Sequence, residues 1–165
     1  MGRVLEDSVW WDYIDKDLKA LLTESALLLE RVSNWNEKFL DYSFVVFPAA
    51  KAYEGFLKTL FLDLGFITKD EYLGKRFRIG RVLNPALEAL VRERESVYDK
   101  IVAFCGGREI ADALWETWKD SRNLLFHWFP NERNVITLEE ARDRIASILS
   151  AMDIAFRECR IKERA

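Results

Sequence analysis

The stretch TLEEARDRIASILSAMDIAFREC, residues 137–159, decides the fold class of this chain. It begins with Thr137 and carries Glu140 three positions later, which is the spacing of a helix-starting capping box. Apolar residues then recur every three or four positions: Leu138, Ala141, Ile145, Ile148, Leu149, Met152, Phe156 and Cys159. This is the period of an α-helix with one buried face, so the sequence predicts a long amphipathic helix that packs against other elements.

The rest of the chain shows the same spacing, interrupted by only three prolines and seven glycines. Thr68 and Glu71 form a second capping pair that predicts a short helix. Longer helices are predicted over residues 17–32, from about Pro48 to Gly65, and from about Glu109 to His127. Two further helices are predicted, one from Asn84-Pro85 through Leu87, Leu90 and Val91, and one from Ser96 to Gly106-Gly107. Residues 39–47 allow two interpretations, a short strand or a helix that continues through Pro48. The predicted fold is all-α, a helical bundle that forms one domain over residues 1–165.

The composition excludes several classes of protein. The 165 residues are 50% hydrophobic and 13% aromatic, which is enough for one globular core and opposes intrinsic disorder. A net charge of −3 opposes binding of nucleic acid over the whole surface, so any RNA contact must come from a local basic patch. The N-terminus lacks a signal-peptide pattern and no apolar run has membrane-spanning length, so we expect a soluble cytoplasmic protein without a membrane partner.

Metal and disulfide chemistry are limited by one histidine and two cysteines. A His/Cys metal centre is excluded because too few of these ligands are present. Cys105 and Cys159 are also too few for a disulfide framework, and they are interpreted as small buried hydrophobic residues. No cofactor is expected, although magnesium held by carboxylates stays open.

The residues that can carry chemistry lie in DSRNLLFHWFP, residues 120–130. Arg122 has a permanent charge and can bind a phosphate through two N–H groups, while His127 can transfer protons near neutral pH. On a regular helix five residues advance by about 500°, so these two side chains would point about 140° apart. Two arrangements bring them together: a helix that loosens before Pro130, or a twofold dimer in which two motifs share one cleft.

A dimer also provides two imidazoles. Cleavage of RNA by its own 2′-hydroxyl needs one general base and one general acid, and each chain has a single histidine. Arg122 would stabilise charge on the phosphorane oxygens, and Asn123 would orient the phosphate or the imidazole, without a metal. The ordinary alternative is that His127 only ends its helix, where a cation interacts favourably with the helix dipole.

The string Arg122-Asn123-Leu124-Leu125-Phe126-His127 resembles the R-x4–6-H motif of HEPN domains, in the form with Asn directly after Arg. Those domains are all-helical, with the motif near the end of a late helix and one more helix after it. The resemblance covers about residues 10–160. It implies a homodimeric, metal-independent endoribonuclease of toxin–antitoxin or phage-defence systems, with a possible protein antitoxin. By this resemblance Arg122 and His127 are catalytic, and Asn123 is their polar auxiliary.

A second segment, FPAAKAYEGFLK at residues 47–58, is similar to the helix that faces the motif in RNase LS-type toxins of the same superfamily. Glu54 matches an acidic residue there and Lys51 a basic residue one turn earlier. Glu54 would orient His127 or raise its pKa by favouring the imidazolium. The alternative is a surface ion pair between Glu54 and Lys58. Phe129 stands where HEPN toxins with nucleotidyltransferase antitoxins carry a modified tyrosine, which disfavours that branch.

The most basic segment is GKRFRIGR, residues 74–81. Its cations can bind an RNA backbone while Phe77 stacks on a base, and the alternative is a solvated loop. These cations are Lys75, Arg76, Arg78 and Arg81. Three tryptophans on or near the motif helix are predicted to pack in the core or in a dimer interface. These are Trp115, Trp118 and Trp128.

Two alternative functions compete with the ribonuclease. The first is a non-catalytic HEPN module that binds RNA, a nucleotide or a partner protein. The second is an unrelated helical bundle, in which Arg122 and His127 lie far from any shared cleft.

Overall fold

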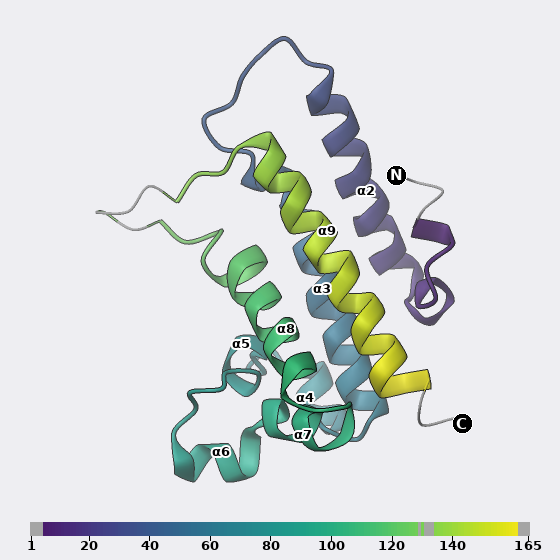
Figure 1. Cartoon of the computed structure of the whole chain (residues 1–165), viewed down its shortest axis with the longest axis vertical. Helices are drawn as coiled ribbons and strands as arrows, with labels where there is room; N and C mark the ends of the chain where they lie inside the picture. The colour runs from purple at the N-terminus through teal and green to yellow at the C-terminus, as the bar shows by residue number, and fades with distance from the viewer. Residues whose placement is uncertain (1–4, 129, 131–133, 162–165) are drawn as a thin grey trace.

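Three long helices, α2 (Lys16–Ser33), α3 (Ser43–Asp63) and α9 (Leu138–Ala155), form the frame of the molecule, and α3 contacts both of the others (Figure 1). The computed structural model describes residues 5–128, 130 and 134–161. Every regular element within these residues is helical, and their buried apolar side chains form one core. The predicted all-α bundle is confirmed. None of the described helices is long and apolar enough to cross a membrane.

The central helix is α3. It begins at Ser43, where the Asp41 carboxylate accepts hydrogen bonds from the Ser43 backbone N–H and hydroxyl. A helix that continues through Pro48 is therefore confirmed, beginning five residues before the proline, and the alternative of a strand over 39–47 is wrong. Pro48 lies in the second turn of a helix whose remaining residues are mostly apolar, and burial of that surface outweighs the loss of one backbone hydrogen bond. The helix ends at Asp63, before Gly65 with its positive φ of 68°.

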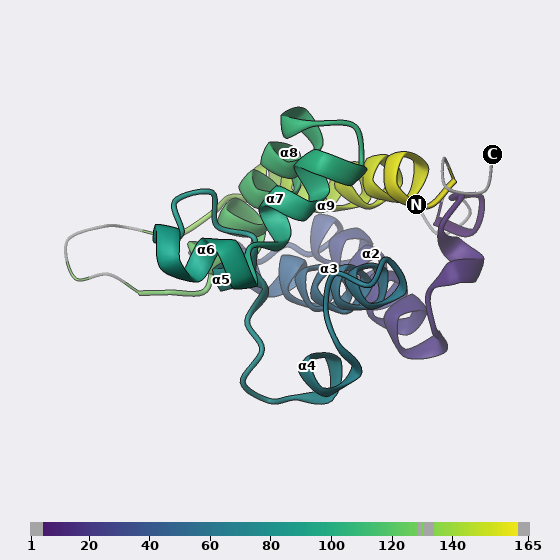
Figure 2. The same cartoon turned by 90° about the horizontal axis from the view of Figure 1, so that it is seen from below.

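Four short helices connect α3 to α8: α4 (Lys69–Leu73), α5 (Ile79–Val82), α6 (Ala89–Glu95) and α7 (Val97–Phe104). Helix α4 lies apart from the other three (Figure 2). The capping box of Thr68 and Glu71 and the cap at Ser96 are confirmed. The helix predicted from Asn84-Pro85 begins only at Ala89, because the Asn84 side chain accepts the Ala86 N–H in a turn. Leu90, predicted to be on the apolar face, is 83% exposed.

The motif helix is shorter than predicted. It begins after Gly106-Gly107, where φ is 107° and 109°, and regular α8 (Arg108–Trp118) ends nine residues before His127. A π-helical turn, η2 (Lys119–Asn123), continues it, with the Leu124 N–H bonded to the Lys119 carbonyl at 2.8 Å. The last helix, α9, begins with both hydrogen bonds of the predicted capping box and is followed by η3 (Phe156–Ile161).

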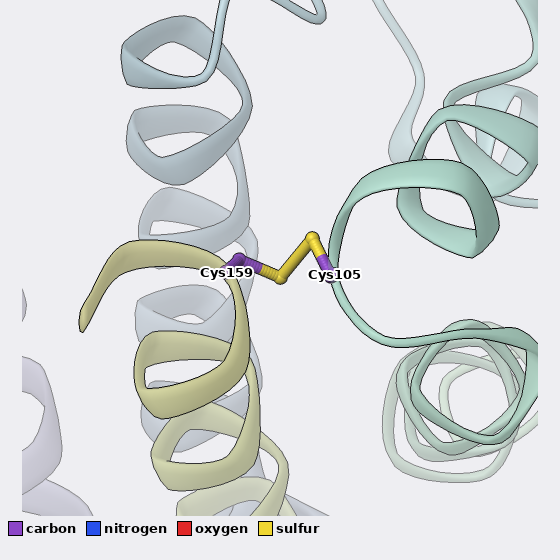
Figure 3. The surroundings of a disulfide bond; sticks show 2 residues. All are labelled: Cys105 and Cys159. Carbon is purple, nitrogen blue, oxygen red and sulfur yellow. A yellow bond between two sulfur atoms is a disulfide. The ribbon is translucent and has the colours of Figure 1, made fainter. Parts of the chain in front are cut away.

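Cys105 and Cys159 form a disulfide between the residue after α7 and η3 (Figure 3). Both side chains are buried, at 0% and 1% exposure, as the sequence predicted. The interpretation as two separate hydrophobic residues was wrong, because spacing in the sequence does not reveal that two helix ends meet. The bond spans 54 residues and therefore encloses α8, the motif and α9 in one covalent loop. A short helical turn near the N-terminus, η1 (Trp11–Tyr13), was not predicted.

Candidate functional site

The π-helical turn η2 sets the direction of Arg122. A π-helix takes more residues per turn than an α-helix and is frequent at functional sites. The turn is held to α9 by an ion pair of 3.2 Å between Asp120 and Arg144. Ser121, between Asp120 and Arg122, is buried. The predicted loosening of the helix before Pro130 is present at η2. That this loosening or a twofold dimer brings Arg122 and His127 together stays a prediction.

Arg122 lies between one carboxylate and two aromatic rings. Its guanidinium is 3.5 Å from the Glu54 carboxylate on α3, and its Cζ lies 5.7 Å from the Trp118 ring centre and 5.9 Å from that of Phe126. The Arg122 side chain is 35% exposed, so one side of it faces solvent. An arginine in this setting is positioned by cation–π contacts while it stays accessible to an anion.

Glu54 is shared between two cations. The predicted i,i+4 pair with Lys58 is present at 3.9 Å, together with the pair to Arg122. Lys51 is exposed one turn before Glu54 on the same helix. Two cations paired with one carboxylate give this cluster a formal charge of +1, although the whole chain has a charge of −3. The orientation of His127 by Glu54 stays a prediction.

The neighbouring Tyr53 fixes α3 against α8. Its buried hydroxyl donates a hydrogen bond of 3.1 Å to the Leu114 carbonyl. Burial raises the pKa of Tyr53 well above its usual value, so the phenol stays neutral and keeps this bond. Glu54, the next residue on α3, is thereby held beside the end of the motif helix.

His127 lies in a different environment from Arg122. It is exposed and lines an open groove of about 430 Å³. The other lining residues are Leu40, Asp41, Ser43, Leu125, Phe126, Trp128, Asn134 and Val135. The Asn134 side chain closes the loop by donating hydrogen bonds to the backbone carbonyls of Leu124 and His127.

Phe126 connects the two environments. It lines the groove, it lies 5.9 Å from Arg122, and its ring meets Phe47 of α3 edge-to-face at 5.3 Å. Phe126 therefore lies near the arginine and lines the same groove as the imidazole. Asn123 ends η2 and is exposed. Phe129 lies outside the described residues.

The predicted basic segment is divided in the structure. Two of its arginines make local contacts: Arg78 donates to the Lys75 and Phe77 carbonyls, and Arg81 pairs with Glu95 at 3.0 Å. Lys75 and Arg76 are exposed. These local contacts favour the solvated-loop interpretation for Arg78 and Arg81, and RNA binding by the segment stays a prediction.

The basic segment nevertheless reaches the motif. Lys58 lies 5.9 Å from the Phe77 ring, and Lys58 is also the second partner of Glu54. A Cβ atom placed on Gly80 would lie only 2.6 Å from Nε1 of Trp118, the ring beneath Arg122. The sequence offered no signal for this approach beyond a glycine among larger residues.

Sequence reasoning also missed an exposed aromatic cluster. Trp35, Phe39, Tyr42 and Phe44 contact one another through ring pairs with centres 5.4–6.3 Å apart. Packing in the core or in a dimer interface was predicted for three tryptophans. Trp118 is buried in the core, and Trp115 is half-buried and packs against it. Trp128 is 82% exposed, so it does not pack in the core of the single chain. Its packing in a dimer interface stays a prediction.

In the described part of the chain, no cluster of three or more His, Cys, Asp or Glu side chains could hold a metal ion.

Comparison of the chain with known protein families, curated proteins and solved structures found no match in any of the three.

Proposed function

We propose that this protein is a metal-independent endoribonuclease of the HEPN type, in which Arg122 and His127 act on the RNA backbone. The observation that carries the proposal is the position of Arg122. A half-buried arginine on a π-helical turn lies between a carboxylate and two rings, and one of these rings, Phe126, lines the same groove as the only histidine of the chain.

In the proposed reaction His127 accepts the proton of the RNA 2′-hydroxyl. The 2′-oxygen then forms a bond to phosphorus, the bond from phosphorus to the 5′-oxygen breaks, and the leaving oxygen receives a proton from an acid. Arg122 stabilises the charge on the phosphorane oxygens. Its guanidinium has five N–H donors, so contact with Glu54 still leaves donors that can bind phosphate. Asn123 orients the phosphate.

The acid comes from a second copy of the chain in this proposal. Each chain has one imidazole, and a twofold homodimer brings two motifs to one cleft, so that one imidazole acts as base and the other as acid. Lys51 adds positive charge beside Glu54 and is proposed to contact the RNA backbone, as are Lys75 and Arg76. Arg78 and Arg81 contribute less, because their guanidinium groups already bind within the protein.

The biological role that fits this reaction is a toxin or phage-defence effector of the RNase LS-type branch, acting in the cytoplasm and controlled by a protein antitoxin. Disulfides are rare in the reducing cytosol. A cytoplasmic location therefore predicts that Cys105 and Cys159 are thiols in living cells, which alkylation of freshly lysed cells followed by mass analysis will measure.

The test of the activity is RNA cleavage in EDTA. We expect the wild type to cleave RNA, to leave 2′,3′-cyclic phosphate ends, and to leave a 2′-deoxy strand intact. His127→Ala and Arg122→Ala are expected to lower the rate by a factor of about 10² to 10⁴. Arg157→Ala is the matched control, because Arg157 is a surface arginine on η3 paired only locally with Asp153. Full activity of both motif variants, or loss of all cleavage in EDTA, would contradict the proposal.

One observation favours the second candidate, a non-catalytic HEPN module that binds RNA, a nucleotide or a partner protein. Arg122 is already paired with Glu54, and this ion pair competes with a phosphate for the guanidinium. This candidate predicts that the purified protein leaves RNA intact, whereas changing Lys75 and Arg76 to alanine weakens RNA binding.

A further inference from the structure

We infer that Lys58 is a positioning residue for Arg122: it faces one oxygen of the Glu54 carboxylate and thereby keeps the Arg122 guanidinium available to a phosphate. The inference rests on the proposed function, in which that phosphate belongs to the RNA. It adds to that function a residue that controls how strongly the protein itself holds its phosphate-binding arginine.

The two cations contact different oxygens of Glu54. The Lys58 Nζ lies 3.9 Å from Oε1, and the Arg122 Nη2 lies 3.5 Å from Oε2. An arginine and a carboxylate pair most strongly when two parallel N–H groups reach both oxygens, at distances of about 2.7–2.9 Å. The pair between Arg122 and Glu54 is longer than this, and Lys58 stands at the second oxygen.

A different arginine of this chain shows the tight form of the pair. Arg92 donates from Nε and Nη2 to the two oxygens of Asp99, at 2.7 and 2.6 Å, and its Nη1 donates to the Pro85 carbonyl. The donors of Arg92 are thus used within the protein. The looser contact of Arg122 with Glu54 leaves more of its donors for a ligand.

Lys58 is held at the carboxylate from two sides. It lies one turn after Glu54 on α3, and a glutamate followed by a lysine four residues later is the favourable order of such a pair. The Phe77 ring of the basic segment lies 5.9 Å from the Lys58 Nζ on the other side. The Lys58 side chain is only 23% exposed, so its position is defined by these contacts.

Loss of the Lys58 charge would therefore tighten the pair between Glu54 and Arg122. The Oε1 oxygen would lose the lysine and would accept a second N–H from the guanidinium. Donors used in this way are lost to a phosphate, and the negative charge of Glu54, no longer offset by Lys58, also repels the phosphate.

Two other roles of Lys58 predict different results. If Lys58 itself binds the RNA backbone, the effect of removing its charge is the same whether or not Glu54 is charged. If Lys58 only stabilises α3 through the i,i+4 pair, its removal leaves the Arg122 guanidinium unchanged.

The first test needs neither RNA nor cleavage. The guanidinium N–H signals of Arg122 are identified by nuclear magnetic resonance through their loss in Arg122→Lys, and their exchange with water is measured. In Lys58→Met this exchange should slow about two- to fivefold, because the pair with Glu54 tightens, whereas Lys58→Arg should restore the wild-type rate.

The matched control is Lys19→Met on α2. Lys19 has the same two kinds of contact as Lys58, a carboxylate (Asp12, at 3.4 Å) and an aromatic ring (Trp11, at 5.3 Å), but it does not contact Glu54. We expect this variant to leave the Arg122 signals and their exchange unchanged.

The second test measures binding of a short 2′-O-methyl RNA, which has no attacking hydroxyl. Lys58→Met should weaken this binding about two- to fivefold in the protein that keeps Glu54, and by less than about twofold in the Glu54→Gln background. Glutamine keeps the shape of the side chain but removes the charge for which the two cations compete.

The possible failures are distinguishable. If the wild type leaves RNA intact but Lys58→Met slows exchange at Arg122, the proposed function fails and the role of Lys58 stands. If cleavage depends on His127 while exchange at Arg122 is the same in the wild type and Lys58→Met, the inference is overturned. An equal loss of RNA affinity in both backgrounds would also overturn it, because Lys58 would then bind the RNA directly.

Discussion

The two ends of the antiparallel pair α8 and α9 are built in opposite ways. At one end, Cys105 just before α8 and Cys159 just after α9 form a buried disulfide (Figure 3). At the other end lie the motif, which follows α8, and the beginning of α9 (Figure 1). That end is held by Asp120–Arg144, by Glu54–Arg122 and by ring contacts of Phe126, and it exposes Trp128.

The two ends therefore contribute differently to the stability of the fold. Covalent and apolar contacts at the disulfide end define the packing of the pair. Ion pairs between partly exposed side chains contribute little to stability, because water competes for both charges. A side chain in such an ion pair can leave its partner within the chain and contact a ligand instead, at little cost in free energy. Segments that bind ligands commonly belong to the less stable parts of a fold. In the structure the disulfide end is linked covalently, whereas the ion pairs at the motif end are more easily replaced.

The largest expected effect is at the disulfide end. Cys105→Ala with Cys159→Ala should lower the free energy of unfolding by about 4 kcal/mol, because a link across 54 residues restricts the unfolded chain. Urea unfolding of the oxidised wild type, the reduced wild type and the variant measures this change. If the two ends act independently, the cleavage rate per folded molecule should stay constant. A loss of activity larger than the loss of folded protein would show that the disulfide end also affects the motif end.

A smaller effect is expected beneath the motif end. Gly80→Ala would place a methyl group 2.6 Å from Nε1 of Trp118, which is a rigid ring and supports Arg122. We expect a loss of about 1–3 kcal/mol in unfolding free energy, as for other overpacked sites, and a lower cleavage rate. Both quantities can be followed by thermal unfolding and by the EDTA assay.

The control for this variant is Gly55→Ala on α3. Its added Cβ would meet only the end of the Leu18 side chain, which can change rotamer, and alanine favours the helix. If Gly80→Ala lowers the free energy of unfolding no more than Gly55→Ala does, α5 can move away from Trp118 to accommodate the methyl group.

The start of α9 at the motif end gives a third effect. Thr137→Ala removes one side of the capping box and should cost about 1 kcal/mol. Thr68→Ala removes the same box from α4, which has five residues and none buried, so the global stability should change less. Urea titrations of the two variants measure the loss of unfolding free energy in each. An equal loss at both sites would show that helix length and burial do not control the contribution of a capping box.

The smallest effect is a pH dependence with a contribution from each end. A hydrogen bond from Arg92 lowers the pKa of Asp99 on α7, and hydrogen bonds from Thr137 lower the pKa of Glu140 on α9. A carboxyl with a lowered folded pKa binds fewer protons when folded. Its stabilising contribution is therefore full above the ordinary pKa of about 4, and it is lost as the pH falls through the folded pKa.

We therefore expect the urea midpoint of the wild type to fall below about pH 4. In Asp99→Asn and Glu140→Gln the fall should be shallower, with the difference confined to that range. A variant midpoint that falls as steeply as that of the wild type would mean that the carboxyl titrates alike in both states. Comparing the two variants assigns the acid sensitivity to one end of the pair or the other.

Much of the fold was predictable from the sequence because its signals are local. Two capping boxes, the cap at Ser96 and the glycines at 65 and 106–107 act through hydrogen bonds and dihedral angles within a few residues, so they mark element ends in any context. The start of α3 stayed undecided between Pro48 and an earlier residue, because the packing against α2 and α9 that extends the helix through Pro48 cannot be seen in a local pattern.

The candidate site was predictable in part. The residue types and spacing at Arg122 and His127 indicated their chemistry, and the similarity of residues 47–58 indicated Glu54. The pairing of Glu54 with Arg122, the groove beside His127 and the exposure of Trp128 could not be predicted, because each depends on a contact or a gap between segments distant in the chain.

By itself the sequence determined that this chain folds as helices, where most of them begin and end, and which residues can move a proton or hold a phosphate. Only the tertiary structure decided that Cys105 meets Cys159, that η2 loosens the motif, and that Phe126 lies between the arginine and the groove. The reason is physical: helix signals act over one or two turns, whereas a site is made by side chains from separate helices, and their meeting depends on how the whole core packs.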